Sequence, residues 1–210
     1  MCFFSKPRLP CIWKRDFMTV YSVKTGNESI GLLAGNAASI SDFESISSIT
    51  VGSSGSSIIS FTNIPSTYAH LQIRAMSRKS SAGGGDGIFI RFNSDTSTNY
   101  SVHDLTGNGS SASAYGAGST GQMNPTCTAT SVESANVFGV QIWDILDYAN
   151  TNKYKTLRAM NGYDNNTSGK VRYGSGLWRS TSVITEINIT GNTDNFSQYT
   201  NFCLYGIKAV

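Results

Sequence analysis

Hydrophobic and polar residues alternate with a period of two along most of the chain. In residues 68–77, apolar positions such as Leu71 and Ile73 alternate with polar positions such as Gln72 and Arg74. This is the pattern of a strand with one face buried and one face in water. Nine further segments have the same character: 47–51, 57–61, 87–93, 100–105, 135–145, 153–160, 170–174, 182–190 and 200–210. Together with residues 68–77, they predict about ten strands.

Clusters of Gly, Asn, Ser and Pro separate these segments, as turns between strands require. The pattern allows one helical turn, at residues 144–149, and no longer helix. Residues 107–126 are too long for a tight hairpin and too poor in apolar residues for a core strand, so we expect a long loop there. Such a loop could bind a partner or have no role. The sequence therefore predicts an all-β fold, an antiparallel, jelly-roll-like β-sandwich at residues 42–210.

Residues 1–41 differ from the rest of the chain, and we expect them to form an extended N-terminal arm. Pro and Gly interrupt every regular period, yet the segment is too apolar for a free solvated tail. An apolar arm favours docking on a partner surface. The sequence from Met18 also resembles a natural beginning, so a start at Met1 or at Met18 stays open. The candidate docking residues are Phe3, Phe4, Ile12, Trp13, Arg15 and Phe17.

Only 14% of the residues are charged, against roughly 25% in an ordinary soluble domain. Small polar residues fill the deficit, and 11% aromatic residues exclude a disordered chain. The net charge of +3 belongs to the beginning of the chain, because residues 1–24 carry five basic residues and one acidic residue. The remainder is nearly neutral, so we expect no nucleic-acid partner. Apolar runs are too short for a secretion signal or a membrane span.

The sequence offers little catalytic or metal-binding chemistry. Four cysteines lack the spacing of a zinc site, and we expect reduced, half-buried thiols. His70 and His103 lie on the polar sides of predicted strands, without a catalytic triad. The oxygen-rich run of residues 93–99 is typical of an Asx turn more than of a calcium loop. We therefore expect no enzyme, cofactor or metal, although four acids remain a minority candidate for glycoside hydrolysis: Asp104, Asp144, Asp147 and Glu186.

Aromatic residues provide the one candidate binding chemistry in the predicted sandwich. Tyrosine and tryptophan can stack on sugar rings because they combine an apolar face with a polar group. Trp143 lies inside an alternating strand, which predicts burial. Tyr115 and Tyr163 have Gly and Asn neighbours, which favours exposure, and Tyr173 is a third candidate for glycan contact.

Four segments, taken in chain order, carry a resemblance to a known family: FTNIPSTYAHLQIRAMSR, IFIRFNSDTSTNYSVHDLTGNGSSASAYG, IWDILDYANTNKYKTLRAMNGYDN and GLWRSTSVITEINITGNTDNFSQYTNFCLYGIK. Together they resemble a family of virion proteins of tailed bacteriophages from marine and other environments. The resemblance extends over about residues 42–210. It implies a β-sandwich displayed on the particle, as a tail-fibre, baseplate or capsid-decoration protein, with no catalytic residues.

The resemblance and the composition lead to one main expectation and one alternative. We expect a non-enzymatic structural protein that is assembled in the host cytoplasm and located in the virion. Its arm would attach to other phage virion proteins of the capsid or tail, and its strand edges favour a homo-oligomer. A surface that is hydrated by hydroxyl and amide groups suits display in salt water, which screens charge. The alternative is a carbohydrate-binding module that recognises a host surface glycan.

Overall fold

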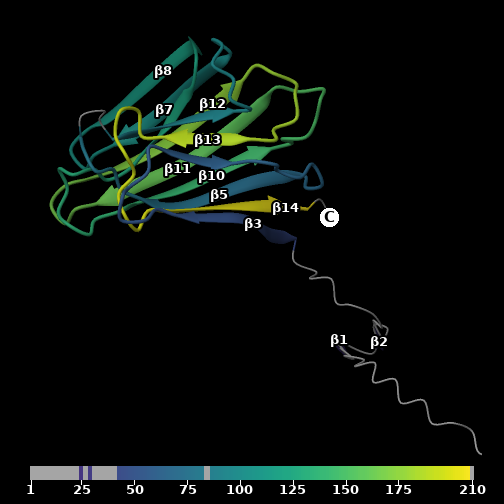
Figure 1. Ribbon diagram of the computed structural model, residues 1–210, viewed down its shortest axis with the longest axis horizontal. Coiled ribbons are helices and arrows are strands. Elements are labelled where there is room, and N and C mark those ends of the chain that lie inside the picture. The colour runs from purple at the N-terminus through teal and green to yellow at the C-terminus, as the bar shows by residue number, and fades with distance from the viewer. Residues whose placement is uncertain (1–23, 26–27, 30–41, 83–85, 209–210) are drawn as a thin grey trace, which may run out of the picture. The chain divides into compact units, whose positions relative to one another are not determined.

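The computed structural model describes residues 24–25, 28–29, 42–82 and 86–208 (Figure 1). The chain divides into two compact units, Met1–Ser41 and Asp42–Val210. In the first unit, the described residues form one short antiparallel pair of strands, β1 (Lys24–Thr25) and β2 (Glu28–Ser29). The predicted docking residues lie outside the described residues: Phe3, Phe4, Ile12, Trp13, Arg15 and Phe17.

The second unit consists of two antiparallel β-sheets packed together, which confirms the predicted all-β sandwich. The large sheet has eight strands, in the order β3 (Phe43–Thr50), β14 (Asn201–Ile207), β5 (His70–Ser77), β10 (Gly139–Leu146), β11 (Lys155–Asp164), β12 (Gly169–Trp178), β7 (Tyr100–Gly107) and β8 (Ala112–Thr120). The small sheet has four, in the order β4 (Ile58–Phe61), β13 (Ile187–Thr190), β6 (Gly87–Phe92) and β9 (Met123–Cys127). The described residues include no helix that could cross a membrane.

Eight of these strands have the connectivity of a jelly roll. Without β7, β8, β11 and β12, the remaining strands of the second unit can be numbered one to eight along the chain. One sheet then has the order 1-8-3-6 and the other the order 2-7-4-5. Each sheet thus combines strands from both halves of the chain, as two interlocked Greek keys require. The jelly-roll-like architecture that the sequence predicted is therefore present.

Two inserted strand pairs enlarge one sheet of the jelly roll. The pair β7–β8 is inserted between β6 and β9, and the pair β11–β12 between β10 and β13. All four strands join the same side of the large sheet, beyond β10. Figure 1 shows β7 and β8 at one edge of this sheet and β3 at the opposite edge. With these insertions, the large sheet has eight strands, which is twice the number in the small sheet that packs against it.

One local prediction was wrong. The expected long loop at residues 107–126 contains β8 and most of β9. Nearly all of β8 is exposed, so it needs no apolar residues to form, and its backbone pairs with β7 along the whole strand. The pattern also allowed a single turn at residues 144–149. There β10 ends at Leu146 and a turn of three residues follows, in which the backbone N–H of Asn150 donates to the carbonyl of Asp147 at 2.9 Å. At residues 107–126 backbone pairing with a neighbouring strand determined the structure, whereas the side-chain pattern did not.

The core lies between the two sheets and is formed by the apolar positions of the alternating pattern. Leu71 and Ile73 on β5 are fully buried, as predicted. Trp143 on β10 is fully buried too, and its ring centroid lies 5.9 Å from that of Phe202. Phe202 in turn packs against Phe196, with ring centroids 5.3 Å apart. Aromatic contacts of this kind add to the hydrophobic stabilisation that burial provides.

An ion pair is buried at one end of the sandwich. Lys79 follows β5 of the large sheet, and its Nζ lies 3.1 Å from the carboxylate of Asp194, which follows β13 of the small sheet. The Lys79 side chain is 0% exposed and that of Asp194 is 5% exposed. The same ammonium group donates hydrogen bonds to the backbone carbonyls of Gly87 and Gly191. These contacts join segments of the two sheets and satisfy a charge that would otherwise be costly to bury.

Candidate functional site

The outer face of the large sheet carries two adjacent rows of apolar side chains. In the first row, Leu105, Tyr173, Met160 and Ile142 are successive cross-strand partners on β7, β12, β11 and β10. In the second row, Val171 and Val140 both pair with Gly162, and Val140 also pairs with Met76 on β5. We call these seven side chains the apolar patch: Met76, Leu105, Val140, Ile142, Met160, Val171 and Tyr173.

The apolar patch is strongly exposed. Val171 is 70% exposed, Met160 60% and Leu105 58%, although such residues are usually buried. Scattered apolar residues on a surface are ordinary, but a contiguous patch marks an interaction surface. The second unit packs only the inner face of this sheet against the small sheet, so no part of that unit covers the patch.

A polar row borders the apolar patch on the same face. Asp144 on β10 and Arg158 on β11 are cross-strand partners there, two residues along from Ile142 and Met160. Gln72 on β5 donates a hydrogen bond of 2.7 Å to Asp144 and lies in the same row. This row places one acidic and one basic side chain next to the apolar patch.

The strand β8 forms one edge of the large sheet. Its nine residues include no charged residue and no proline, and most of them are exposed. Natural proteins usually protect such edges with charges, proline or bulges, because the unpaired backbone groups can pair with another chain. This edge has one bulge, at Ser119 near its end, and the rest of the strand is uncharged and lies beside the apolar patch, which is a second feature that favours association.

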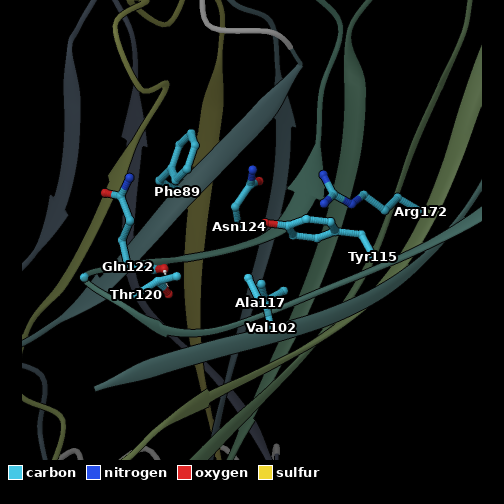
Figure 2. Close-up of a pocket in the computed structure, with 9 residues that line it drawn as sticks. Phe89, Val102, Tyr115, Ala117, Thr120, Gln122, Asn124 and Arg172 are labelled. Carbon is cyan, nitrogen blue, oxygen red and sulfur yellow. Dashed lines mark hydrogen bonds between the residues drawn. The ribbon is translucent and has the colours of Figure 1, made fainter. Parts of the chain in front are cut away.

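A cleft of about 540 Å³ opens between the two sheets at the β8 side. It exists because the inserted pair β7–β8 extends the large sheet beyond β9, the edge strand of the small sheet. Figure 2 shows Tyr115 pointing into this cleft toward Asn124, with Phe89 and Gln122 on the other side. The lining residues are Phe89, Val102, Tyr115, Ala117, Thr120, Gly121, Gln122, Asn124 and Arg172.

The charged groups at the base of this cleft neutralise one another. The guanidinium group of Arg172 donates to the carboxylate of Asp104 at 2.6 Å and to the carbonyl of Thr126 at 2.8 Å. The side chains of Arg172 and Asp104 are 11% and 3% exposed. The remaining donor, Nε of Arg172, is buried without a hydrogen-bond partner. The pair therefore contributes polarity to the cleft but no net charge.

The three tyrosines expected to contact glycans lie in different places. Tyr115 is 55% exposed and lines the cleft. Tyr173 belongs to the apolar patch on the opposite face, since its register partner Leu105 pairs with Ala114 and not with Tyr115. Tyr163 was expected to be exposed, which is wrong, because it is half-buried. Burial, followed by the negative charge of Glu133, raises the pKa of Tyr163 above its usual range. The structure does not bring the three side chains together.

The histidines and the candidate acids all have separate surroundings. His70 accepts a hydrogen bond from the backbone of Asp147, and His103 is exposed on β7. Asp147 also pairs with Lys153. Glu186 accepts hydrogen bonds from Ser94 and Asn188, while Asp104 and Asp144 have the partners described above. Each acid thus has a local structural role, and none of these hydrogen bonds and ion pairs joins two of them.

The oxygen-rich run at residues 93–99 is an Asx turn. The Asp95 carboxylate accepts hydrogen bonds from the backbone N–H of Ser97, from Asn99 and from the indole of Trp178. The Trp178 hydrogen bond, with those of Asn99 and Ser97, lowers the pKa of Asp95 to about 2. Within the described residues, no group of three or more His, Cys, Asp or Glu side chains could hold a metal ion.

Two of the four cysteines fall within the described residues, and both are free thiols. Cys127 is fully buried, and burial raises the pKa of its thiol to about 12. Cys203 is partly exposed on β14 and donates to the amide oxygen of Asn201 at 3.0 Å. The other two, Cys2 and Cys11, lie outside the described residues.

Sequence reasoning did not identify four of the residues around Tyr115: Phe89, Gln122, Asn124 and Arg172. Gln122 and Asn124 belong to the segment that was expected to be a loop, and Phe89 and Arg172 lie on strands far apart in the chain. Only the topology brings them together, so no local signal could have found them.

Comparisons with known proteins give no relative from which a role for these sites could be inferred. No family model matches the chain, and no match was found among curated proteins or among solved structures.

Proposed function

We propose that this chain is a non-enzymatic structural protein of a bacteriophage virion. Residues 1–41 attach it to other virion proteins, and the jelly-roll unit is displayed on the particle surface, as a capsid decoration or as part of a tail fibre or baseplate. The apolar patch carries the proposal, because a side chain such as Met160, 60% exposed, suits a protein that works in an assembly. The resemblance of residues 42–210 to phage virion proteins supports it. The jelly roll also occurs in viral capsid domains, although a fold alone does not define a function.

We further propose that the apolar patch joins two copies of this chain. Six of its seven side chains are about half exposed or more, from 49% for Tyr173 to 70% for Val171, and such a contiguous apolar surface suits burial against a partner. The seven side chains of the patch are uncharged, and the exposed side chain of Arg74, the cross-strand partner of Ile142 on β5, continues its first row. The adjacent row carries Asp144 beside Arg158, and a two-fold rotation can place the acid of one copy near the base of the other. A second copy therefore fits both the apolar and the charged parts of this face.

The attachment role of residues 1–41 is tested by deletion in the phage that encodes the chain. We expect the shortened protein to keep the β-rich circular dichroism spectrum of the full chain, because the core residues that the structure describes all belong to the second unit. Purified particles should lack it, as an immunoblot would show. Normal incorporation of the shortened protein would contradict the attachment role.

The contact between copies is tested by placing a charge in the centre of the apolar patch. Size-exclusion chromatography with light scattering should show an oligomer for the full chain and a monomer for Met160→Glu, because a buried, unpaired carboxylate is costly. Val132→Glu is the matched control, since Val132 is 76% exposed and lies outside the patch. A monomeric full chain, or an oligomeric Met160→Glu variant, would contradict the contact.

A further inference from the structure

We propose that the cleft between β8 and β9 binds an uncharged oligosaccharide. This site lies on the opposite side of the large sheet from the apolar patch. Sugar binding at this site does not depend on the proposed assembly role. It would be a second function of the same chain.

The first argument is the shape and the apolar walls of the cleft. Phe89 comes from the small sheet, and Tyr115 and Ala117 come from the overhanging strand β8. A volume of about 540 Å³ falls in the usual range for small-ligand sites. Sugar rings present flat faces of C–H groups, which pack well against aromatic side chains. Figure 2 shows Phe89 and Tyr115 on opposite sides of Asn124.

The second argument is the supply of unused hydrogen-bonding groups. The Tyr115 hydroxyl and the Gln122 amide line the cleft, and neither makes a hydrogen bond to any described residue. Asn124 also lines the cleft, and its amide nitrogen can donate to the carbonyls of Ile88 and Thr126, at 3.2 Å each. These groups can both donate to and accept from sugar hydroxyls. Their mixture with aromatic rings favours a sugar over a purely apolar ligand.

The third argument concerns charge. Among the described residues that line the cleft, Arg172 is the one basic residue, and its guanidinium group is paired with Asp104. An anionic sugar would have to compete with the Asp104 carboxylate at 2.6 Å and would be repelled by it. A cationic ligand would find no uncompensated acid. The cleft is therefore suited to a neutral chain of sugars.

Isothermal titration of the full chain tests this inference directly. The probes are neutral hexasaccharides (maltohexaose, cellohexaose, mannohexaose and hexa-N-acetylchitohexaose) and the acidic hexagalacturonate. We expect at least one neutral probe to bind with a dissociation constant below ~1 mM, which corresponds to about −4 kcal/mol. The acidic probe should bind about tenfold more weakly or not at all. Absence of binding by every neutral probe, or preference for the acidic one, would overturn the inference.

Variants decide whether this binding occurs in the cleft. Tyr115→Ala should weaken it at least about tenfold, and Gln122→Ala should weaken it about threefold to tenfold. Tyr154→Ala is the matched control, because Tyr154 is 56% exposed and does not line the cleft, against 55% for Tyr115. Unchanged binding by Tyr115→Ala would overturn the inference. Since Tyr115 is not in the patch, loss of sugar binding should leave the oligomer intact, which separates this site from the proposed assembly role.

Discussion

Replacing the buried lysine of the sandwich by an apolar residue should destabilise the protein strongly. Lys79→Met keeps the length of the side chain and removes its charge. The ammonium group contacts Asp194 at 3.1 Å and two backbone carbonyls, and the lysine side chain is 0% exposed. The variant therefore removes the ammonium group that pairs with a carboxylate only 5% exposed.

The expected size of the effect follows from this burial. Breaking a buried ion pair by removing one partner costs about 3–5 kcal/mol of unfolding free energy. For a domain of this size, that corresponds to a decrease of roughly 6–20 °C in the melting temperature. The matched control is Lys153→Met, whose partner Asp147 is also a carboxylate but whose own side chain is 59% exposed. An exposed pair of this kind contributes at most ~1 kcal/mol.

Urea unfolding of the full-length variants, followed by tryptophan fluorescence, measures both free energies. The buried residues Trp143 and Trp178 report on the sandwich core. A Lys79→Met variant within ~1 kcal/mol of the wild type, or no more destabilised than Lys153→Met, would refute the argument that this pair joins the two sheets.

Three further predictions concern single groups. Hydrogen bonds lower the pKa of Asp95 to about 2, so its ionised form stabilises the fold above about pH 4, and this contribution is lost as the pH falls toward 2. The difference in melting temperature between wild type and Asp95→Asn should therefore be largest at pH 7 and shrink toward pH 2. Iodoacetamide at pH 8 should label Cys203 in the folded protein and Cys127 only after unfolding, as peptide mass spectrometry would show. Gly174→Ala should cost about 1–3 kcal/mol in urea unfolding, because the added Cβ would lie 2.6 Å from Pro125 Cβ. A constant difference across pH, early labelling of Cys127, or a neutral Gly174→Ala would count against the respective argument.

The sequence predicted the parts of the fold that depend on the burial of large apolar side chains. The alternation in residues 68–77 identified β5, and the buried Trp143 followed from the same pattern. The strand β8 was missed because Ala, Gly, Ser and Thr alternate without a contrast in hydrophobicity. Its formation depends on backbone pairing with β7, which is a contact between segments and leaves no periodic signal in either.

The candidate sites were predictable only in part. Tyr115 was identified as exposed because of its small neighbours, but Gln122, Asn124 and Arg172 join it only through the order of the strands. The apolar patch was not predicted. A strand with apolar residues on both faces, such as β11 with Leu157 and Met160, gives no indication of which face the second sheet will cover.

The most direct test of the virion role is mass spectrometry of the phage particles themselves. Virions of the encoding phage would be purified on a density gradient, washed in high salt and digested with trypsin. We predict peptides from residues 42–210 in the virion fraction, at an abundance comparable to that of other structural proteins and unchanged by the wash. Peptides found only in the lysate supernatant, with none in the virion fraction, would contradict the central claim that this chain is a structural protein of the virion.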